Sequence, residues 1–345
     1  MRTRRISAVA ITVAASVGIA ACGSSSSSGG SSSKDLVGAG STLIAPLMSQ
    51  WQPNYDTASG VAVTYGAIGS GGGIEQITAR TVDFGASDAP MTPSQATACK
   101  GCVEIPWALA ATAVAYNVKG VTNQLKLSGP VLADIYLGQI TTWDAPQIKA
   151  LNPGVNLPAT KITPVYRSDG SGDTYAFTNF LSQISPTFKS KVGNATQVSF
   201  PTGIGGKGNS GVGGVLTSTN GSIAYIAISY VLAHKFDYAL VQNAAGKYPV
   251  PGIPSISAAA AAVKTTPNGT AGVSIVNPPA SAPGAYPIST YTYSIVPTSS
   301  SKSSQLKAFI KWAITTGQTY GPKLDFAPLP SQIVSGDETA LTKIK

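Results

Sequence analysis

Short apolar runs alternate with helical stretches along most of the chain. Five runs are predicted as strands because of their length and their branched or aromatic residues: Val61–Tyr65, Leu109–Tyr116, Ile162–Tyr166, Ser222–Ile228 and Tyr291–Val296. An amphipathic helix is predicted over Ser304–Thr316 from the i, i+3, i+4, i+7 spacing of Leu306, Phe309, Ile310, Ala313 and Ile314. Strands that alternate with helices indicate an α/β protein with a largely parallel or mixed sheet. Residues 250–285 are rich in Pro, Ala, Gly and Ser, and they predict one helix near Ser255–Lys264 and then a long connection.

Three segments share the order strand, Gly/Ser/Thr turn, helix. They are Leu36–Leu43 before a helix near Pro46–Trp51, Val63–Gly73 before Ile74–Ala79, and Pro164–Asp173 before Thr174–Leu181. The first N–H groups of a helix lack partners and carry the positive end of its dipole, and Gly lets the backbone approach a ligand closely. Each turn alone is well explained as a capped helix. Three in one chain, with Arg167 beside one of them, favour a shared site for an anion.

Composition and charge narrow the function further. Charged residues make up 11% of the 345 residues and hydrophobic residues 43%, so the chain forms a core and is neither disordered nor a coiled coil. The formal charge is +9, or +6 without the three arginines of the N-terminal segment discussed next. No basic run interleaves with aromatic residues, which argues against a nucleic-acid surface. A mild positive charge instead favours a small anion.

The N-terminus predicts export and a lipid anchor. Met1–Arg5 is a positive region, and residues 6–21 are apolar and too short for a membrane span, as in a secretory signal. Ile19-Ala20-Ala21-Cys22 resembles a bacterial lipobox, which implies cleavage before Cys22 and acylation of that residue, for example with palmitate. Plain signal cleavage nearby is the alternative. Gly23–Ser33 contains only Gly and Ser, and it is predicted to be a flexible tether.

Residues that often carry catalysis or bind metals are scarce. Cys99 and Cys102 form a close pair that usually oxidises in an exported protein, with free thiols or a redox or metal role as alternatives. The single histidine, His234, is interpreted as an ordinary residue, and three Cys with one His cannot make two ligand pairs for a metal. Gly203–Gly208 superficially resembles a P-loop, but Gly208 follows Lys207 where Ser or Thr is required. No metal, cofactor or nucleotide enzyme is therefore expected.

Several motifs together resemble the phosphate-binding lipoproteins of bacterial high-affinity phosphate ABC transporters, most closely the actinobacterial branch. The resemblance covers almost all of residues 36–335 and rests on Gly38–Thr42, Gly69–Gly73, Val82–Pro90, Asp134–Gly138 with Trp143-Asp144, Arg167–Gly172 and Gly205–Asn209. It implies an α/β, two-lobed periplasmic-binding-protein fold of the type II kind, with two chain crossovers between lobes. The implied divisions are residues 1–21 as signal peptide, 22–35 as lipidated Cys and tether, 36–113 plus 285–345 as lobe one, and 114–284 as lobe two.

The resemblance also implies a phosphate site. The implied ligands are Thr42 and Ser70 as hydroxyl donors, Leu43 as a backbone donor, Asp88 as an acceptor carboxylate, Arg167 as a cationic clamp, Ser171 and Gly172 as donors, and Asp173. Asp173 stands where the family often has Thr, which removes a donor and adds a second carboxylate. Three alternatives remain from the residues themselves: Asp88 as a turn or cap residue, Arg167 in a surface ion pair, and Asp173 as a cap of its own helix.

The function implied is capture of inorganic phosphate outside the cytoplasmic membrane by a non-enzymatic, lipid-anchored and monomeric protein that passes it to permease subunits. A binding protein of the same fold for arsenate, molybdate or a phosphonate is the alternative. A secreted phosphatase and a surface interaction or sensor protein are the other classes, and the phosphatase is disfavoured because the chain lacks a metal cluster and a histidine nucleophile.

Overall fold

The computed structural model describes residues 34–122, 124–263 and 273–345, and the signal, lipobox and tether predictions lie outside these ranges. Ten strands are described: β1 Leu36–Gly40, β2 Val63–Ala67, β3 Phe84–Ser87, β4 Cys102–Asn117, β5 Lys126–Leu127, β6 Thr163–Arg167, β7 Ile204–Gly206, β8 Ser222–Ala227, β9 Asp237–Val241 and β10 Ser289–Pro297. They form a mixed sheet in the order β2-β1-β3-β10-β4-β8-β6-β7, with β9 paired to β4 and β5 to β9.

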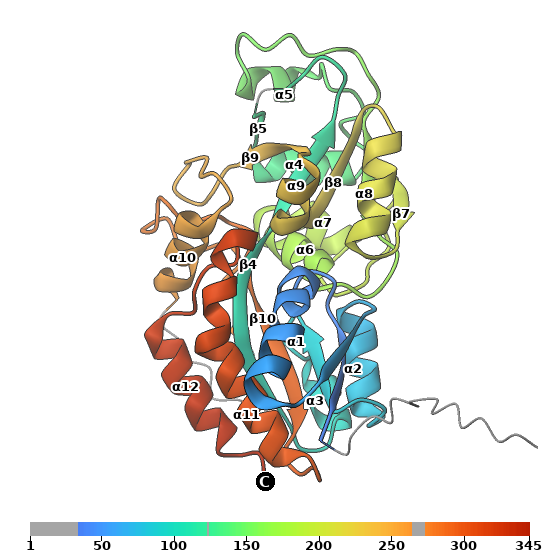
Figure 1. The fold of residues 1–345 in the computed structure, drawn as a ribbon. Coiled ribbons are helices and arrows are strands. Elements are labelled where there is room, and N and C mark those ends of the chain that lie inside the picture. Colours follow the sequence, from blue (N-terminus) through green and yellow to red (C-terminus); the bar gives the residue numbers. More distant parts are fainter. Residues whose placement is uncertain (1–33, 123, 264–272) are drawn as a thin grey trace, which may run out of the picture. The chain divides into compact units, whose positions relative to one another are not determined.

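The long strand β4 connects the two parts of this sheet (Figure 1). Residues 102–111 of β4 pair antiparallel with β10, whereas residues 112–117 pair antiparallel with β8. Every residue of β4 between its two ends is buried, in agreement with its nearly continuous apolar sequence. One strand therefore carries the chain from the β1–β3 part to the β6–β8 part, and β10 lies beside it.

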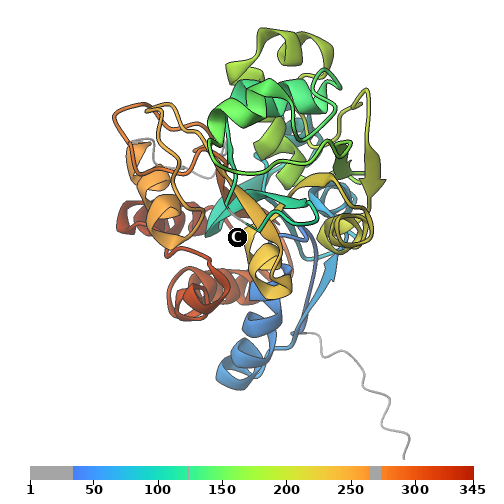
Figure 2. The ribbon, with the colours of Figure 1, turned by 90° about the horizontal axis from the view of Figure 1, so that it is seen from above.

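Twelve α-helices are described: α1 Ala45–Ser59, α2 Ser70–Thr78, α3 Pro93–Ala98, α4 Gly129–Tyr136, α5 Pro146–Leu151, α6 Gly172–Ile184, α7 Pro186–Lys191, α8 Gly208–Ser218, α9 Ile228–His234, α10 Ile253–Ala262, α11 Ser303–Ile314 and α12 Ser331–Leu341. Two short 3-10 helices, Thr316–Tyr320 and Pro322–Leu324, follow α11. Figure 2 shows helices on both sides of the strands. None of the described helices combines the length and the apolar character that a membrane span requires.

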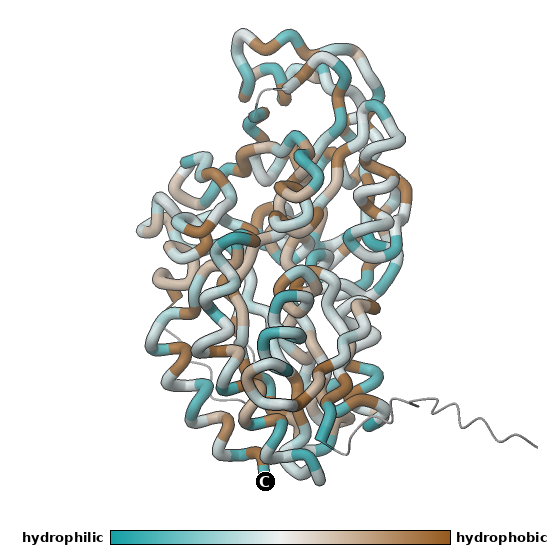
Figure 3. Tube along the Cα trace, viewed as in Figure 1, coloured by the Kyte–Doolittle hydropathy of each residue, from teal (hydrophilic) through white to brown (hydrophobic). Residues whose placement is uncertain are grey.

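Most elements predicted from periodicity are confirmed with small shifts of their ends, but β4 begins at Cys102, well before the predicted Leu109, and α1 continues to Ser59, past the predicted Trp51. The amphipathic helix predicted over Ser304–Thr316 is α11, and its five apolar positions are all buried. Hydrophobic and hydrophilic residues alternate along α11 and α12 in Figure 3. The helix predicted from Ile74 is wrong at its start, because α2 already begins at Ser70 and includes the glycines predicted as a turn. A Cβ at Gly73 would lie 2.6 Å from the Cα of Gly40, so this glycine permits close helix–strand packing.

Buried aromatic side chains fill the core beneath β1 and β3. The rings of Trp51 and Trp107 lie 5.4 Å apart in an edge-to-face arrangement, and Phe84 and Phe309 pack against Trp107. Trp51 Nε1 donates to the carbonyl oxygen of Gly317 at 2.8 Å, so its polar atom is satisfied inside the core. This cluster fixes α1 and α11 against the sheet, and thereby fixes the turn at the start of α1.

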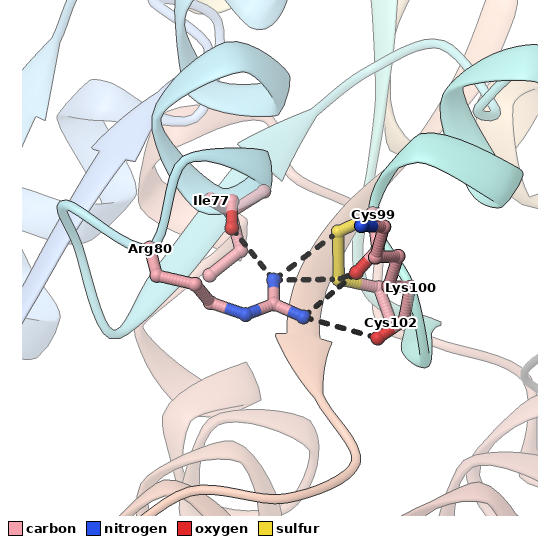
Figure 4. Close-up of a disulfide and its surroundings, with 5 residues drawn as sticks. All are labelled: Ile77, Arg80, Cys99, Lys100 and Cys102. Carbon is pink, nitrogen blue, oxygen red and sulfur yellow. Dashed lines mark hydrogen bonds between the residues drawn. A yellow bond between two sulfur atoms is a disulfide. The ribbon is translucent and has the colours of Figure 1, made fainter.

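Cys99 and Cys102 are joined by a disulfide at the end of α3 and the start of β4 (Figure 4). The guanidinium of Arg80 lies against it and donates to the carbonyl oxygens of Ile77 and Cys99, each at 2.7 Å, and to Cys102 Sγ at 3.2 Å. Arg80 therefore connects the C-terminal turn of α2 with the disulfide loop. A cation near the last carbonyl groups of a helix is stabilising because of the helix dipole.

Candidate functional site

The side chain of Asp88, just after β3, is the centre of a buried polar cluster. It is 1% exposed. Its Oδ2 accepts hydrogen bonds from Ser41 Oγ at 2.6 Å and from Ser70 Oγ at 3.3 Å. Its Oδ1 has no hydrogen-bond partner among the described residues. A buried carboxylate oxygen without a partner is costly in a native protein, which marks this oxygen as a candidate acceptor for a ligand.

Burial and a second carboxylate change the titration of Asp88. Removal from water raises the pKa of Asp88 to about 7, and the nearby Asp173 carboxylate acts in the same direction. The Ser41 hydroxyl, Arg167 and the Ser70 hydroxyl oppose this rise. Asp88 therefore changes its protonation close to neutral pH.

The guanidinium of Arg167, at the end of β6, faces two other carboxylates. Arg167 Nε donates to Asp169 Oδ1 at 2.8 Å, and Nη1 donates to Asp173 Oδ2 at 3.0 Å. The side chain of Arg167 is 1% exposed, so the interpretation of Arg167 as a surface ion pair is wrong. Burial acts to raise the pKa of Asp169, but Arg167 outweighs it and holds this pKa below its usual range. The result is a fixed, buried cation with its fork held on two sides.

Asp173, on the first turn of α6, differs from Asp88 because both of its oxygens have donors. Oδ1 accepts from Thr112 Oγ1 at 2.8 Å, and Oδ2 accepts from Arg167 and from Asn209 Nδ2, the latter at 3.2 Å. Burial raises its pKa, while Arg167, Thr112 and Asn209 oppose this rise. The interpretation of Asp173 as a cap of its own helix is wrong: Ser171 is the N-cap, and its hydroxyl accepts from the N–H groups of Asp173 and Thr174.

Glycines let the two parts of the sheet meet at this cluster. Gly172 N donates to Ser70 Oγ at 3.0 Å, and Gly71 N donates to the carbonyl oxygen of Gly170 at 3.0 Å. A Cβ at Gly172 would lie 2.3 Å from the Cβ of Asp88. No other residue type fits this contact without displacing backbone, so the N-terminus of α6 lies directly against Asp88 and Ser70.

Thr42 and Leu43 occupy the turn between β1 and α1. The hydroxyl oxygen of Thr42 accepts a hydrogen bond from Asn209 Nδ2 at 3.0 Å. Leu43 N donates to Ser41 Oγ at 3.0 Å, and the buried Leu43 side chain packs in the core. Of the residues predicted for the site, Ser70, Asp88 and Gly172 are in direct contact, Arg167 and Asp173 form the adjoining ion pair, and Ser171, Thr42 and Leu43 border them.

Four residues of the cluster were missed by the sequence predictions: Ser41, Thr112, Asp169 and Asn209. Ser41, Asp169 and Asn209 lie in motifs that carry the family resemblance, so their position in those motifs was an available signal. Thr112 lies inside the apolar strand β4, where a single hydroxyl gives no periodic signal. A fourth strand–turn–helix unit, β7 followed by α8, also reaches the cluster, because Gly208 N donates to Asp169 Oδ1 at 2.9 Å.

The described part of the chain holds no group of three or more His, Cys, Asp or Glu side chains placed to bind a metal. His234 is exposed and stacks on Tyr230 with ring centroids 4.0 Å apart. The cluster instead combines helix N-termini, hydroxyls and one guanidinium with one acceptor oxygen that has no partner. This combination suits an anion that also carries a proton.

Comparisons with known proteins agree with this chemistry. Residues 25–316 match a family model described as a PBP superfamily domain. The chain is 41% identical to the phosphate-binding protein PstS of Xylella fastidiosa, over 87% of this chain and 82% of that protein. It is 34% identical to the phosphate-binding protein PstS2 of Mycobacterium bovis, over 94% of each.

Solved structures show the fold. A phosphate-binding protein from Stenotrophomonas maltophilia aligns with a TM-score of 0.70 at 18% identity, covering 88% of this chain and 93% of that one. A high-affinity periplasmic phosphate-binding protein solved with phosphate aligns with a TM-score of 0.70 at 21% identity, covering 89% and 93%. The predicted α/β, two-lobed periplasmic-binding-protein fold is confirmed. The chain belongs to the PstS family of phosphate-binding proteins within the PBP superfamily.

Proposed function

We propose that this protein captures inorganic phosphate outside the cytoplasmic membrane and delivers it to the permease subunits of an ABC transporter. The observation that carries the proposal is the Oδ1 of Asp88, which has no partner in the part of the chain that the structure describes and is buried beside Ser70, Gly172 and the Arg167 ion pair. The relatives named above are phosphate-binding proteins by name, and this supports a binding role without catalysis.

Asp88 supplies the selectivity. Phosphate near neutral pH keeps at least one proton, and an ionised Asp88 accepts a hydrogen bond from that P–OH group. Sulfate carries no proton, so the same carboxylate faces only acceptor oxygens and a like charge. An unpaired buried charge costs several kcal/mol, whereas a tenfold preference needs only about 1.4 kcal/mol. One ionised carboxylate is therefore enough to disfavour sulfate, and the effect grows as the pH rises above about 7, where Asp88 is ionised.

The other proposed ligands provide donors. Thr42, Ser70 and Ser171 offer hydroxyls, and Leu43 and Gly172 offer backbone N–H groups. Arg167 offers its charge and the N–H groups that Asp169 and Asp173 leave over. The Leu43 and Gly172 N–H groups donate to serine hydroxyls in this structure, and phosphate oxygens would compete as stronger, charged acceptors for them. Asp173 acts on the ligand through Arg167, which it holds in place, because both of its oxygens already have donors.

Release and anchoring follow from the same proposal. Residues 36–113 with 285–345 would form lobe one and residues 114–284 lobe two, which separate by a hinge motion when phosphate passes to the permease.

Acylation at Cys22, which lies outside the described residues, would keep a monomeric protein on the outer face of the membrane. Cys22→Ala should release the protein into the soluble fraction. If the variant stays bound to membranes after a carbonate wash, the predicted lipid anchor is wrong.

Calorimetry tests the proposed function. The protein, stripped of ligand by unfolding and refolding, is titrated with phosphate, sulfate, arsenate and molybdate, and hydrolysis of a phosphate monoester is assayed beside it. At pH 8, where Asp88 is ionised, the expected result is tight phosphate binding, at least about tenfold weaker sulfate binding, and no hydrolysis. Molybdate or sulfate binding tighter than phosphate would assign another oxyanion, and turnover of the ester would assign an enzyme.

A further inference from the structure

Asn209 joins three separate segments at the edge of the site. It lies at the start of α8 and is 3% exposed. Its Nδ2 donates to Thr42 Oγ1 at 3.0 Å and to Asp173 Oδ2 at 3.2 Å, and its Oδ1 accepts from Ala227 N at 3.0 Å. Every polar atom of this carboxamide therefore has a partner, in the turn after β1, in α6 and at the end of β8.

The orientation of this carboxamide is determined by its partners. The backbone N–H of Ala227 is only a donor, so the atom that faces it is the oxygen. The nitrogen must then face Asp173, which is only an acceptor when it is ionised. Asn209 thus presents a donor to Asp173 by necessity. No other type of side chain of this size supplies one acceptor and two donors in this arrangement.

Asn209 also lies between an open space and the buried carboxylate. Thr42, Asn209 and Tyr230 line a cavity of about 310 Å³, which Asp173 does not line. The side chain of Asp173 is fully buried behind them. The hydrogen bond between Asn209 and Thr42 consequently spans the edge of the site, and it links a residue of proposed lobe one with a residue of proposed lobe two.

We propose that Asn209 is a positioning residue for ligand retention, whose carboxamide couples closure of the site across Thr42 to the orientation of Asp173 and, through it, of Arg167. This inference rests on the proposed function, because it concerns how the same site holds its anion. When the lobes separate, the Thr42 contact is lost, and the carboxamide keeps only Asp173 and Ala227, which lie in the same proposed lobe as Asn209. When they close, Thr42 again fixes the carboxamide in the orientation that donates to Asp173.

The test compares phosphate affinity and the rate of phosphate dissociation in four variants. Asn209→Ala should weaken binding at least about tenfold, mainly through faster dissociation, because it removes a charge-assisted bond and the link to Thr42. Thr42→Val should cost less in the Asn209→Ala background than in the wild type, since the two residues act through one hydrogen bond. Asn152→Ala is the matched control, because Asn152 is a buried Asn that caps the C-terminus of α5 and has three hydrogen bonds to backbone atoms of Lys126 and Ile148, none of them to a site residue among the described residues.

Asn209→Asp should make phosphate affinity, relative to that of the wild type, depend on pH, which a purely structural role of Asn209 would not do. Ionised, the new carboxylate repels Asp173, so phosphate binding at pH 8 should fall further than in Asn209→Ala. Protonated near pH 5, its O–H again donates to Asp173, and the loss relative to wild type should shrink at least about threefold. The charged or titratable groups that face it are Asp173 on α6, Arg167 on β6, Asp169 after β6, Lys207 before α8 and Tyr230 on α9. The ratio to wild type at each pH cancels the titration of free phosphate, which is the same for both proteins.

The outcomes separate the two proposals. If the wild type binds no phosphate, the proposed function fails. If the wild type binds phosphate and Asn209→Ala stays within about twofold of it, the role of Asn209 is wrong. A constant ratio of Asn209→Asp to wild type from pH 5 to pH 8 would also overturn it. Thermal unfolding of each variant without phosphate excludes a folding defect, and the isosteric Asn209→Asp keeps the test valid if Asn209→Ala does not fold.

Discussion

The two buried carboxylates of the site, Asp88 and Asp173, look alike in the sequence but differ in the structure. Asp88 follows a strand of the β1–β3 part, and its Oδ1 has no partner among the described residues. Asp173 lies on α6 in the β6–β8 part, and donors reach both of its oxygens. Under the proposed function this difference predicts two roles: Asp88 would face the ligand, and Asp173 would hold the cation that faces the ligand.

The hydrogen-bond partners of Asp88 and Asp173 also explain why their pKa values differ. Burial raises the pKa of both carboxyl groups, but three donors, one of them a guanidinium, favour the ionised form of Asp173. Asp88 has only hydroxyl donors on one oxygen, and its pKa rises to about 7. Asp88 therefore titrates near neutral pH, whereas Arg167, Thr112 and Asn209 oppose the rise of the Asp173 pKa that burial causes.

Removal of Arg167 should have the largest effect, because it takes away the partner of two carboxylates at once. Arg167→Ala should weaken phosphate binding by more than about 2 kcal/mol, roughly thirtyfold. Arg167→Lys keeps the charge without the fork and should be intermediate. Calorimetry measures both, with thermal unfolding as the check on folding. A loss of less than about threefold in Arg167→Ala would remove Arg167 from the site.

Asp88→Asn should change selectivity more than affinity. The substitution replaces one acceptor oxygen with a donor NH₂ group, so sulfate gains a hydrogen bond and loses a repelling charge. The ratio of phosphate to sulfate affinity should fall at least about tenfold. Competition calorimetry at pH 8, where Asp88 of the wild type is ionised, gives the ratio. If neither Asp88→Asn nor its combination with Asp173→Asn lowers it, both carboxylates are structural.

The single substitution Asp173→Asn is the matched comparison for Asp88→Asn. It should weaken both anions through Arg167 and change their affinity ratio by less than about threefold, since Asp173 has no free acceptor for the ligand. A change in the ratio as large as that of Asp88→Asn would instead make Asp173 a second acceptor. The same titrations measure it.

The sequence predicted those features whose signals are local in the chain and missed those that depend on distant residues. The strand–turn–helix order predicted the β1–α1, β2–α2 and β6–α6 units because Gly, Ser and apolar spacing are local signals. The start of α2 was missed because its glycines serve contacts with Gly40 and Gly170, which are distant in the sequence. The difference between Asp88 and Asp173 depends on Thr112 and Asn209, which reach Asp173 from other strands and helices, so no local pattern reveals it.

Acid should reduce the selectivity of the wild type. Asp88, with a pKa of about 7, is ionised above neutral pH and protonated below it. A protonated Asp88 donates to sulfate instead of repelling it, so sulfate affinity should rise about tenfold or less between pH 8 and pH 5.5. Sulfate titrations at both pH values measure the rise. Asp88→Asn should show little of it, and an equal rise in that variant would assign the titration to another group.

Substitution of a third buried carboxylate, Asp337 on α12, should have the smallest effect on phosphate binding. It can be compared with Asp88 and Asp173. It is fully buried, and neither oxygen has a partner among the described residues. Burial raises the pKa of Asp337 to about 9. Folded Asp337 is therefore protonated at neutral pH, whereas the unfolded chain ionises it near the usual value of about 4. Its contribution to stability is fully present below that value and is lost as the pH rises toward 9.

Asp337→Asn removes this pH-dependent loss while leaving the site unchanged. Between pH 5 and pH 8 the free energy of unfolding of the variant should rise relative to that of the wild type by about 4 kcal/mol, with phosphate affinity unaltered. Urea unfolding at the two pH values measures the gain, and Asp56→Asn at an exposed position of α1 is the control. A difference between variant and wild type that stays constant over this range would mean that Asp337 is ionised in the folded protein. Burial would then not be enough to protonate a carboxylate in this fold, and the titration assigned to Asp88 would need another cause.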